Sequence, residues 1–477
     1  MLDRLARVGL VLICIACPRG FAQESSETAD EARAALHSIE GFYRGAYQRL
    51  GSVLPVEVRL ERDDSGTLVA YERFPDWIYY GFLGPEVVTV EPGGNNAQPT
   101  MAFDGLYGPV TLTLDEQYRE LIGGTASAHP AVTLHIKRAL PPPTISIVER
   151  ELVVPGVVPL AATLVLPEGD GPHGCVVHLA GRGCSTRSRM LGQARVLAEY
   201  GVASLVFDKR GSSADAFDCN DVTFAMVVDD AVAAYELAIA QPEIDPARTG
   251  LKGGSAGAWT AHGVAERALT SPTTPTPAFI ITWVGPATSI EQQQRDAAEA
   301  IAQRLGLDEQ ALALAFEQME LAMDRQTPSD ELFLRFERIR KQAEEGGWLG
   351  PMFAPSDFPA NAEAIDTVWL RRFSYDPTNL LRSLEDTPYL AVFGELDDVV
   401  PLEKNAARLQ GLLDEAGNSD LTIVTIPGQR HSTEHGDMSR TLRMPGPDLV
   451  YWKFARVEPL FMESTIEILR VHGIATR

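Results

Sequence analysis

The chain has 477 residues, and its 65 acidic side chains outnumber the 41 basic ones, which leaves a formal net charge of −24 at pH 7. Ordinary proportions of hydrophobic residues (45%) and charged residues (22%) indicate a globular protein and argue against wholesale disorder. Because phosphate backbones and anionic membrane surfaces repel so acidic a chain, we expect neither nucleic acid nor such a membrane as a partner.

The first 22 residues have the pattern of a secretory signal peptide. Arg4 and Arg7 supply positive charge, Val8–Cys17 is an apolar run of ten residues, and Gly20 and Ala22 are small residues at the positions of a cleavage site after Ala22. Ten apolar residues are too few to cross a bilayer as a helix, and no other segment is long enough. We therefore expect an exported protein, periplasmic or secreted, with no membrane span. An N-terminal anchor or a buried helix is the alternative.

A polar leader, residues 23–37, is expected to precede a small antiparallel β domain over residues 38–140. Short alternating segments bounded by Gly, Pro or Asn recur through this domain, and that spacing is typical of a barrel or sandwich. The predicted strands include Val56–Leu60, Thr67–Phe74, Val87–Val90, Val110–Leu114 and Val132–Ile136. The segment suggests no catalytic group, and Pro141–Pro143 is a stiff spacer that marks its end.

Residues 141–477 show a different pattern, in which apolar runs alternate with helical segments such as Phe224–Ala240. Continuous apolar runs suit strands that are buried on both faces, and their alternation with helices predicts a mostly parallel sheet flanked by helices. The runs are Val176–Leu179, Ala203–Phe207, Phe279–Trp283, Tyr389–Phe393 and Thr422–Ile426.

A helical insertion over about residues 286–372 interrupts this alternation. We expect it to form a lid over the edge of the sheet, and a helical decoration without a gating role is the alternative. Its apolar side chains either line an acyl pocket or pack within the insertion. The candidates are Phe316, Met319, Met323 and Phe333.

The candidate nucleophile is Ser255, which lies in the segment Gly253–Gly257 (GGSAG) with the spacing G-x-S-x-G. Small residues suit a strained turn in which a strand and a helix pack closely, and the turn exposes the serine hydroxyl. The turn also directs the N–H of Ala256 toward a developing oxyanion. A plain turn serine is the alternative.

A serine nucleophile needs a base and an acid that orients the base. Asp397 comes just after one apolar run, and His431 comes just after the next. Because the carboxyl ends of parallel strands share one edge of a sheet, we expect these two side chains to lie near Ser255. The predicted triad is therefore Ser255, Asp397 and His431. Asp398 stays open as an alternative acid and His435 as an alternative base.

The oxyanion hole needs a second main-chain donor, and the glycine-containing turn after Leu179 is the candidate. Gly181 and Gly183 would let the main chain of this turn approach a substrate carbonyl. We assign the two donors to the N–H groups of Arg182 and Ala256.

The segment His431–His435 (HSTEH) offers a rival interpretation, because H-x-x-E-H binds zinc when both histidines lie one turn apart on a helix. Pro427 and Gly428 precede the segment and Gly436 follows it, so a stable helix is poorly supported. A third ligand is not evident, and no CxxC pair is present. We expect no metal ion and no other cofactor, with a zinc hydrolase as a remote alternative.

Six segments of the second domain together carry a resemblance to a known family. They are Gly181–Arg187 (GRGCSTR), Asp208–Ser212 (DKRGS), Gly253–Gly257 (GGSAG), Tyr375–Pro377 (YDP), Gly394–Pro401 (GELDDVVP) and His431. The set resembles the serine α/β-hydrolase superfamily, especially bacterial exported hydrolases with an N-terminal β domain, and the match covers roughly residues 145–477. Ser, Asp and His also follow one another in the order that this superfamily uses. The resemblance implies an α/β-hydrolase fold.

Two residues depart from the pattern of the family. Ala180 stands where the family usually has a histidine, which leaves a hole built from main-chain N–H groups intact. Cys184 stands where the family usually has a proline. Because the resembling folds place the loops of Cys184 and Cys219 beside the site, and export favours oxidation, a disulfide between them is our hypothesis. Cys175 lies in an apolar run and is expected to be a buried thiol.

The resemblance implies an exported serine hydrolase that cleaves a small-molecule carboxylic ester. In this hypothesis Ser255 is the nucleophile, His431 the base and Asp397 the orienting acid, and catalysis proceeds through an acyl-enzyme. A serine peptidase or a thioesterase would use the same triad, and a non-catalytic binding protein is a further alternative. The sequence leaves open the substrate, the oligomeric state and the role of the β domain.

Overall fold

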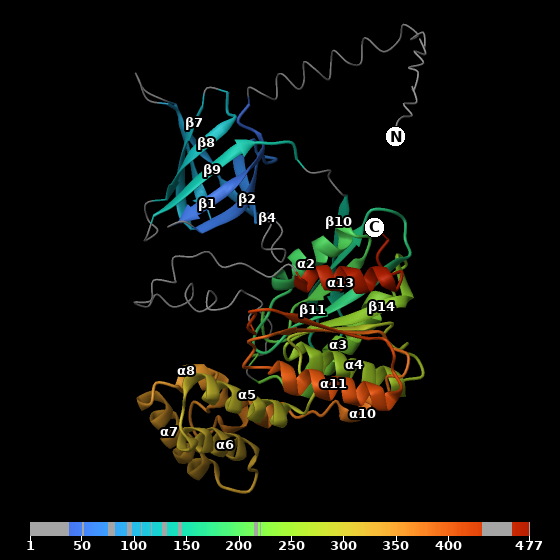
Figure 1. The fold of residues 1–477 in the computed structure, drawn as a ribbon. Helices are drawn as coiled ribbons and strands as arrows, with labels where there is room; N and C mark the ends of the chain where they lie inside the picture. The colour runs from blue at the N-terminus through green and yellow to red at the C-terminus, as the bar shows by residue number, and fades with distance from the viewer. Residues whose placement is uncertain are drawn as a thin grey trace, which may run out of the picture.

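The computed structural model describes residues 38–49, 52–74, 82–92, 98–105, 107–115, 117–125, 131–141, 146–213, 218–219, 221–431 and 460–476. These residues form an antiparallel β domain and a larger α/β domain (Figure 1). The predicted signal peptide (1–22), the polar leader (23–37) and His435 lie outside the described residues.

The N-terminal domain is one sheet in which every neighbouring pair of strands is antiparallel, as predicted. The strand order is β4-β3-β2-β1-β9-β8-β7-β6-β5. The sheet curls, so that β4 also contacts β6 (Figure 1). The strands are β1 (Gly41–Arg49), β2 (Ser52–Arg62), β3 (Leu68–Arg73), β4 (Phe82–Val87), β5 (Thr89–Glu91), β6 (Thr100–Gly105), β7 (Gly108–Leu114), β8 (Glu120–Thr125) and β9 (Val132–Arg138).

Alternation along these strands fills the inside of the curled sheet with apolar side chains. In β7, Val110, Leu112 and Leu114 are fully buried, whereas the residues between them are exposed. Tyr43 and Tyr47 on β1 are also fully buried in this core. Alternating side chains point to opposite faces of a strand, and this is why the pattern could be read from the sequence.

The second sheet has the order β10-β11-β13-β12-β14-β15-β16-β17. All pairs from β13 through β17 are parallel, and β10 and β11 join one edge in antiparallel fashion. The five strands predicted from apolar runs are all present. The strands are β10 (Ile147–Val154), β11 (Leu160–Pro167), β12 (His173–Leu179), β13 (Ala203–Phe207), β14 (Ile244–Gly254), β15 (Ile280–Trp283), β16 (Tyr389–Gly394) and β17 (Leu421–Ile426).

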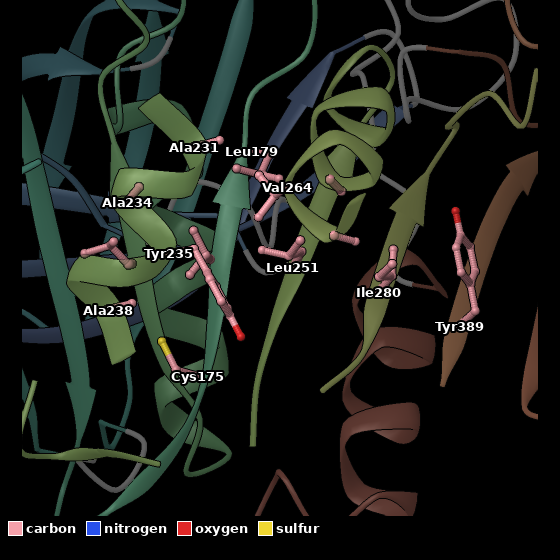
Figure 2. Close-up of a cluster of buried hydrophobic side chains, with 14 of the residues drawn as sticks. Cys175, Leu179, Ala231, Ala234, Tyr235, Ala238, Leu251, Val264, Ile280 and Tyr389 are labelled. Carbon is pink, nitrogen blue, oxygen red and sulfur yellow. The ribbon is translucent and has the colours of Figure 1, made fainter. Parts of the chain in front are cut away.

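Helices cover both faces of this sheet, so its strands are buried on both sides. In β12, Val177 packs in one apolar cluster with Ala231 and Tyr235, two residues labelled in Figure 2. The neighbouring Val176 packs in another cluster with Phe461. Packing on each face removes large apolar side chains from water. Burial of each such side chain stabilises the fold by about 1.5–3 kcal/mol. The helices are α2 (Ser188–Glu199), α3 (Phe224–Ile239), α4 (Gly257–Thr270), α10 (Thr378–Leu381), α11 (Leu402–Ala416) and α13 (Leu460–Val471).

The predicted helical insertion lies between β15 and β16, and its buried apolar side chains form one cluster with residues of α3 and α4 such as Phe224 and Trp259. Ser289 caps its first helix, accepting a hydrogen bond of 3.2 Å from the N–H of Gln292. Pro328 lies at the N-cap of a later helix. The elements are α5 (Ile290–Leu305), α6 (Glu309–Met323), α7 (Ser329–Glu345), α8 (Leu349–Met352), η1 (Pro355–Asp357), η2 (Ile365–Thr367) and α9 (Trp369–Arg372).

Across the part of the chain that the structure describes, none of the helices combines the length and the apolar character that crossing a membrane requires.

The main chain is tightly constrained at the junction between β14 and α4. Ser255 has φ 52°, a left-handed conformation that residues with a Cβ rarely adopt. Such strain costs of the order of 1–3 kcal/mol and persists only where surrounding contacts enforce it. Here the N–H of Ser255 donates to the carbonyl oxygen of Trp283 on β15 at 2.9 Å. A Cβ on Gly253 would collide with the carbonyl oxygen of Gly257, so the turn requires glycine at this position.

We predict that Gly253→Ala lowers the free energy of unfolding by about 1–3 kcal/mol or more, because the main chain of α4 must move to accept the methyl group. The matched control is Gly411→Ala in α11, where an added Cβ meets nothing within 4 Å. This control should be neutral or stabilise by about 0.5–1 kcal/mol through helix propensity. Thermal unfolding of the two variants measures the difference, and equal midpoints would contradict the prediction.

Candidate active site

The structure brings Ser255, His431 and Asp397 together beyond the carboxyl ends of three parallel strands. Ser255 follows β14, Asp397 follows β16 and His431 follows β17. The Oγ of Ser255 lies 2.9 Å from Nε2 of His431, and Nδ1 of His431 lies 2.9 Å from Oδ2 of Asp397. With the Nδ1 proton donated to Asp397, Nε2 accepts a hydrogen bond from the Ser255 hydroxyl.

Asp397 is held in place through both of its carboxylate oxygens. Oδ2 faces His431, and Oδ1 accepts hydrogen bonds of 2.9 Å from the N–H groups of Val399 and Val400. The side chain has no exposed surface. A buried carboxylate whose two oxygens both accept hydrogen bonds is held in one orientation. It can therefore fix the orientation of an imidazole.

The alternative acid Asp398 has different partners. Its carboxylate forms a salt bridge with Arg304 of α5 and lies 3.9 Å from Arg430. The geometry therefore supports Asp397 as the partner of the His431 ring, and Asp398 as a link between this loop and the helical insertion.

The pKa of His431 is raised above its ordinary value of 6.5. Burial acts to lower this pKa, but the charge of Asp397, its hydrogen bond and the charge of Asp398 together outweigh the effect of burial. An imidazole with a raised pKa is a stronger base, and its protonated form is stabilised by the neighbouring carboxylate.

The turn after β12 lies against Ser255. A Cβ built on Gly181 would lie 3.1 Å from the carbonyl oxygen of Gly254 and 3.5 Å from Cβ of Ser255. Within the described residues, the N–H groups of Arg182 and Ala256 donate to no other group. Both predicted oxyanion donors are thus unengaged and lie on the two segments that meet beside Ser255.

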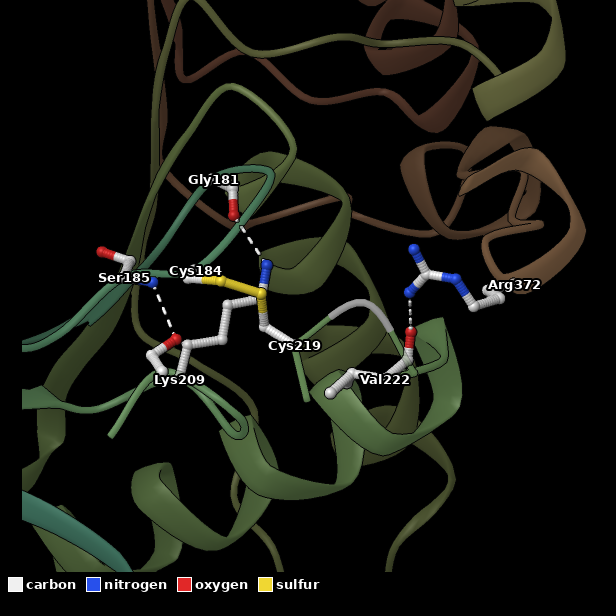
Figure 3. The surroundings of a disulfide bond; sticks show 8 residues. Gly181, Cys184, Ser185, Lys209, Cys219, Val222 and Arg372 are labelled. Atoms are coloured by element: carbon white, nitrogen blue, oxygen red, sulfur yellow. Dashed lines mark hydrogen bonds between the residues drawn. A yellow bond between two sulfur atoms is a disulfide. The ribbon is translucent and has the colours of Figure 1, made fainter. Parts of the chain in front are cut away.

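A disulfide joins Cys184 of this turn to Cys219, with 5.6 Å between the Cα atoms (Figure 3). The same turn is held by a hydrogen bond of 2.8 Å from the N–H of Ser185 to the hydroxyl of Ser212. Cys175 is a buried free thiol. The loop that carries Arg182 is therefore tied covalently to the segment before α3.

Asp208 and Arg210 brace the neighbouring loop through separate partners. Asp208 accepts hydrogen bonds from the main-chain N–H of Arg187 at 2.8 Å and from its guanidinium at 3.1 Å. Arg210 forms a buried salt bridge with Asp230 of α3. Asp208 and Arg210 therefore take part in two separate ion pairs.

A cavity of about 350 Å³ opens beside Ser255, between the sheet and the helical insertion. Its wall is largely apolar and includes Trp259 of α4, Ile301 of α5, Met352 of α8 and Trp369 of α9. The insertion therefore supplies one side of the cavity that Ser255 lines.

Arg182 joins the turn after β12 to the insertion. Its guanidinium stacks over Trp369 at 4.2 Å from the ring centroid, donates to the hydroxyl of Ser356 at 2.8 Å and pairs with Asp357. These contacts were not foreseen, because η1 and α9 are single turns that carry no periodic pattern. Trp259 was also missed, although its place one helical turn after Ser255 could have identified it.

The four apolar side chains proposed for an acyl pocket pack elsewhere. Met319 is buried in the core of the insertion, and Phe316 packs against that core. None of the four contributes to the wall of the cavity beside Ser255. Phe316 and Met319 therefore serve packing, which was the second of the two possibilities.

The zinc interpretation rests mainly on residues outside the described part of the chain. Of the segment from His431 to His435, only His431 is described, and its ring faces Ser255 and Asp397. Among the residues that the structure describes, no group of three or more His, Cys, Asp or Glu side chains is arranged to hold a metal ion.

Comparison with known proteins adds a match in sequence and several in structure. A family model described as an α/β-hydrolase fold matches residues 221–341, and a search of curated proteins finds no match. The solved structures that are similar include Thermogutta terrifontis esterase 2 phosphoramylated by tabun, at 17% identity over 69% of this chain and 96% of that chain, with a TM-score of 0.39. Others are a 2,6-dihydroxy-pseudo-oxynicotine hydrolase (18%, 70% of each chain, TM-score 0.38) and a bacterial heroin esterase (19%, 69% of this chain and 85% of that chain, TM-score 0.39).

Such distant structural similarity carries no argument about activity. The assignment rests on the matched family model, the strand order of the second sheet and the strained turn that presents Ser255. The second domain has the α/β-hydrolase fold, and a separate antiparallel β domain precedes it in the chain.

Proposed function

We propose that the protein is a serine hydrolase that cleaves carboxylic esters of small molecules through an acyl-enzyme. The observation that carries this proposal is the chain of two 2.9 Å contacts from Ser255 through His431 to Asp397, placed at an apolar cavity. A hydroxyl next to an oriented imidazole is the arrangement that activates a serine nucleophile.

In this mechanism, the Oγ of Ser255 attacks the carbonyl carbon of the ester while Nε2 of His431 takes the hydroxyl proton. Asp397 stabilises the imidazolium that forms, and the N–H groups of Arg182 and Ala256 receive the negative charge that develops on the carbonyl oxygen. His431 then gives the proton to the departing alcohol. Water, with His431 again as the base, then attacks the carbonyl carbon of the acyl-enzyme. The acid is released and the hydroxyl of Ser255 is restored.

The shape of the cavity favours a small acyl or alcohol group over an extended peptide. A volume of about 350 Å³ is at the small end of the range for ligand pockets, and the largely apolar wall suits a hydrocarbon substituent. The insertion closes one side of the cavity, where a peptide substrate would need an open groove on both sides of the scissile bond.

Two features support export to the periplasm or the medium. The first 22 residues have the pattern of a signal peptide, and the Cys184–Cys219 disulfide would persist in an oxidising compartment.

We predict that Ser255→Ala lowers kcat for p-nitrophenyl esters by about 10⁴- to 10⁶-fold without changing the thermal midpoint, because the nucleophile is lost and the fold is not. The matched control is Ser65→Ala, a serine substitution in an exposed turn of the β domain, which should retain full activity. A fluorophosphonate should label the wild-type protein and the control, but not Ser255→Ala. Full esterase activity in Ser255→Ala would contradict the proposal.

The same assay separates the ester hydrolase from its alternatives. Short acyl esters should be cleaved with a higher kcat/KM than acyl thioesters or peptide anilides. A preference for the thioester or the anilide would replace ester hydrolysis with thioesterase or peptidase activity on the same triad. Sensitivity to a chelator together with indifference to the fluorophosphonate would favour the zinc interpretation.

We predict that Asp397→Asn lowers kcat by about 10⁴-fold, because an asparagine at this position favours the wrong tautomer of His431. Asp398→Asn is the matched control one residue away. Since Asp398 pairs with Arg304 instead of the His431 ring, its loss should change kcat only a few-fold. Steady-state kinetics of the two variants measure the difference, and a larger loss in Asp398→Asn would reverse the assignment.

The raised pKa of His431 sets the direction of the pH dependence. Only the neutral imidazole accepts the serine proton, so kcat/KM should fall on the acidic side of the pH profile. The midpoint of this acidic limb should lie above 6.5, the ordinary pKa of histidine. In Asp397→Asn, burial acts on the ring without the opposing charge, and the limb should move to lower pH. Residual activity measured from pH 5 to 8 tests this shift, and an unmoved limb would show that His431 is not the titrating base.

A further inference from the structure

The side chain of Lys209 makes a contact that the triad does not explain. Lys209 follows β13, and its ammonium donates a hydrogen bond of 2.8 Å to the carbonyl oxygen of Gly181 (Figure 3). The residue is partly buried, and within the described residues no carboxylate pairs with it. The charged groups that act most strongly on the ammonium are the cations Arg182 and Arg372.

The contacted carbonyl belongs to the peptide that carries one of the oxyanion donors. The carbonyl of Gly181 and the N–H of Arg182 are two ends of a single planar peptide group. A cation on the oxygen of a peptide draws electron density away from its N–H, and hydrogen bonds linked in this way strengthen one another. The N–H of Arg182 therefore becomes a stronger donor toward a negative charge near Ser255.

Among the residues that the structure describes, the charges around Lys209 include no carboxylate that pairs with it. Arg182 is paired with Asp357, and Arg372 donates to the carbonyl oxygens of Thr367 at 2.8 Å and Val222 at 2.6 Å. An unpaired ammonium that is partly withdrawn from water is unfavourable in the ground state. A tetrahedral intermediate adds a negative charge at the oxyanion hole, and this is where such a cation gains a favourable interaction.

We propose that Lys209 is a positioning residue of the oxyanion hole, whose ammonium orients and polarises the Gly181–Arg182 peptide for the tetrahedral intermediate. This inference rests on the proposed function, because it concerns the same reaction at Ser255. It assigns a role in the reaction to a residue that does not touch the triad.

The loop does not depend on the ammonium for its shape. The Cys184–Cys219 disulfide and the hydrogen bond from Ser185 to Ser212 hold the same turn. The main-chain N–H of Lys209 also donates to the carbonyl oxygen of Ser185 at 2.9 Å, and a change of side chain leaves this bond in place. Loss of the ammonium should therefore appear in the rate of reaction more than in stability.

The surroundings also predict how the contact responds to pH. Burial, Arg372 and Arg182 together lower the pKa of Lys209 to about 8. The Arg210–Asp230 salt bridge lies on the wall of the small cavity that Lys209 also lines. As the pH rises through about 8, the ammonium loses its proton and kcat should fall to the level of a variant without the charge.

The test uses the mature protein with Lys209→Met, which keeps an unbranched apolar stem, and Lys209→Arg, which restores a cation. We expect Lys209→Met to lower kcat by about 10- to 100-fold with KM within about 3-fold, because the lost interaction exists only in the transition state. Affinity for an alkyl boronic acid, which forms a tetrahedral adduct with the serine, should fall by the same factor. Lys209→Arg should recover most of kcat.

Arg372→Met is the matched control, since it removes a second cation of the same cluster whose carbonyl partners lie outside the oxyanion peptide. Its kcat should change far less than that of Lys209→Met. The wild-type protein should show a partial alkaline decrease in kcat near pH 8, and Lys209→Arg should lack it. This profile keeps the proposal testable even if Lys209→Met does not fold.

Unchanged kcat in folded Lys209→Met, a change in KM alone, or absence of the alkaline decrease in the wild-type protein would each overturn the inference. These outcomes are distinct from failure of the proposed function. If Ser255→Ala is inactive while Lys209→Met is fully active, the role of Lys209 is wrong and the serine hydrolase stands. If Ser255→Ala is fully active, both proposals fail.

Discussion

The left-handed backbone of Ser255 is the constraint on which the rest of the site depends. A φ of 52° is unfavourable for a serine, so contacts with the surrounding structure must offset the free-energy cost of this conformation. It does so by packing α4 so closely against β14 that only glycine fits at 253, and by a hydrogen bond of 2.9 Å from the Ser255 N–H to β15. The result is a hydroxyl that stands clear of the sheet within reach of His431. Without this turn, the side chain would follow the alternation of the strand into the core.

Each of the other groups is positioned by the end of a different strand, and each is fixed by contacts of its own. Asp397 is held by two main-chain N–H groups, and the turn of Arg182 is held by a disulfide. These restraints are independent of one another, which means that the geometry does not rely on a single flexible loop. A preorganised site of this kind stabilises developing charge without having to rearrange during the reaction.

Much of this arrangement could be predicted from the sequence, because buried strands require continuous apolar runs and the ends of parallel strands meet at one edge of the sheet. Five apolar runs became strands of the parallel sheet, and three chemical groups at strand ends came together as their positions implied. Strand β8 was missed, because Gly123 and Gly124 break its pattern. An added Cβ at either residue would collide with a carbonyl oxygen of a neighbouring strand, so the sheet requires glycine at both positions. Glycine by itself has a low preference for strands, and this is why the sequence pattern did not indicate β8. The contacts of Arg182 and Lys209 were also beyond prediction, because long side chains reach partners that no local periodicity encodes.

The central claim is that Ser255 carries the acyl group during turnover. The most direct measurement is mass spectrometry of the protein quenched in acid within the first turnover of an activated ester, followed by peptide mapping. The account predicts a mass increase equal to the acyl group on the peptide that contains Ser255, and its disappearance as the substrate is exhausted. Steady turnover with no such adduct, or an adduct on a different residue, would contradict it.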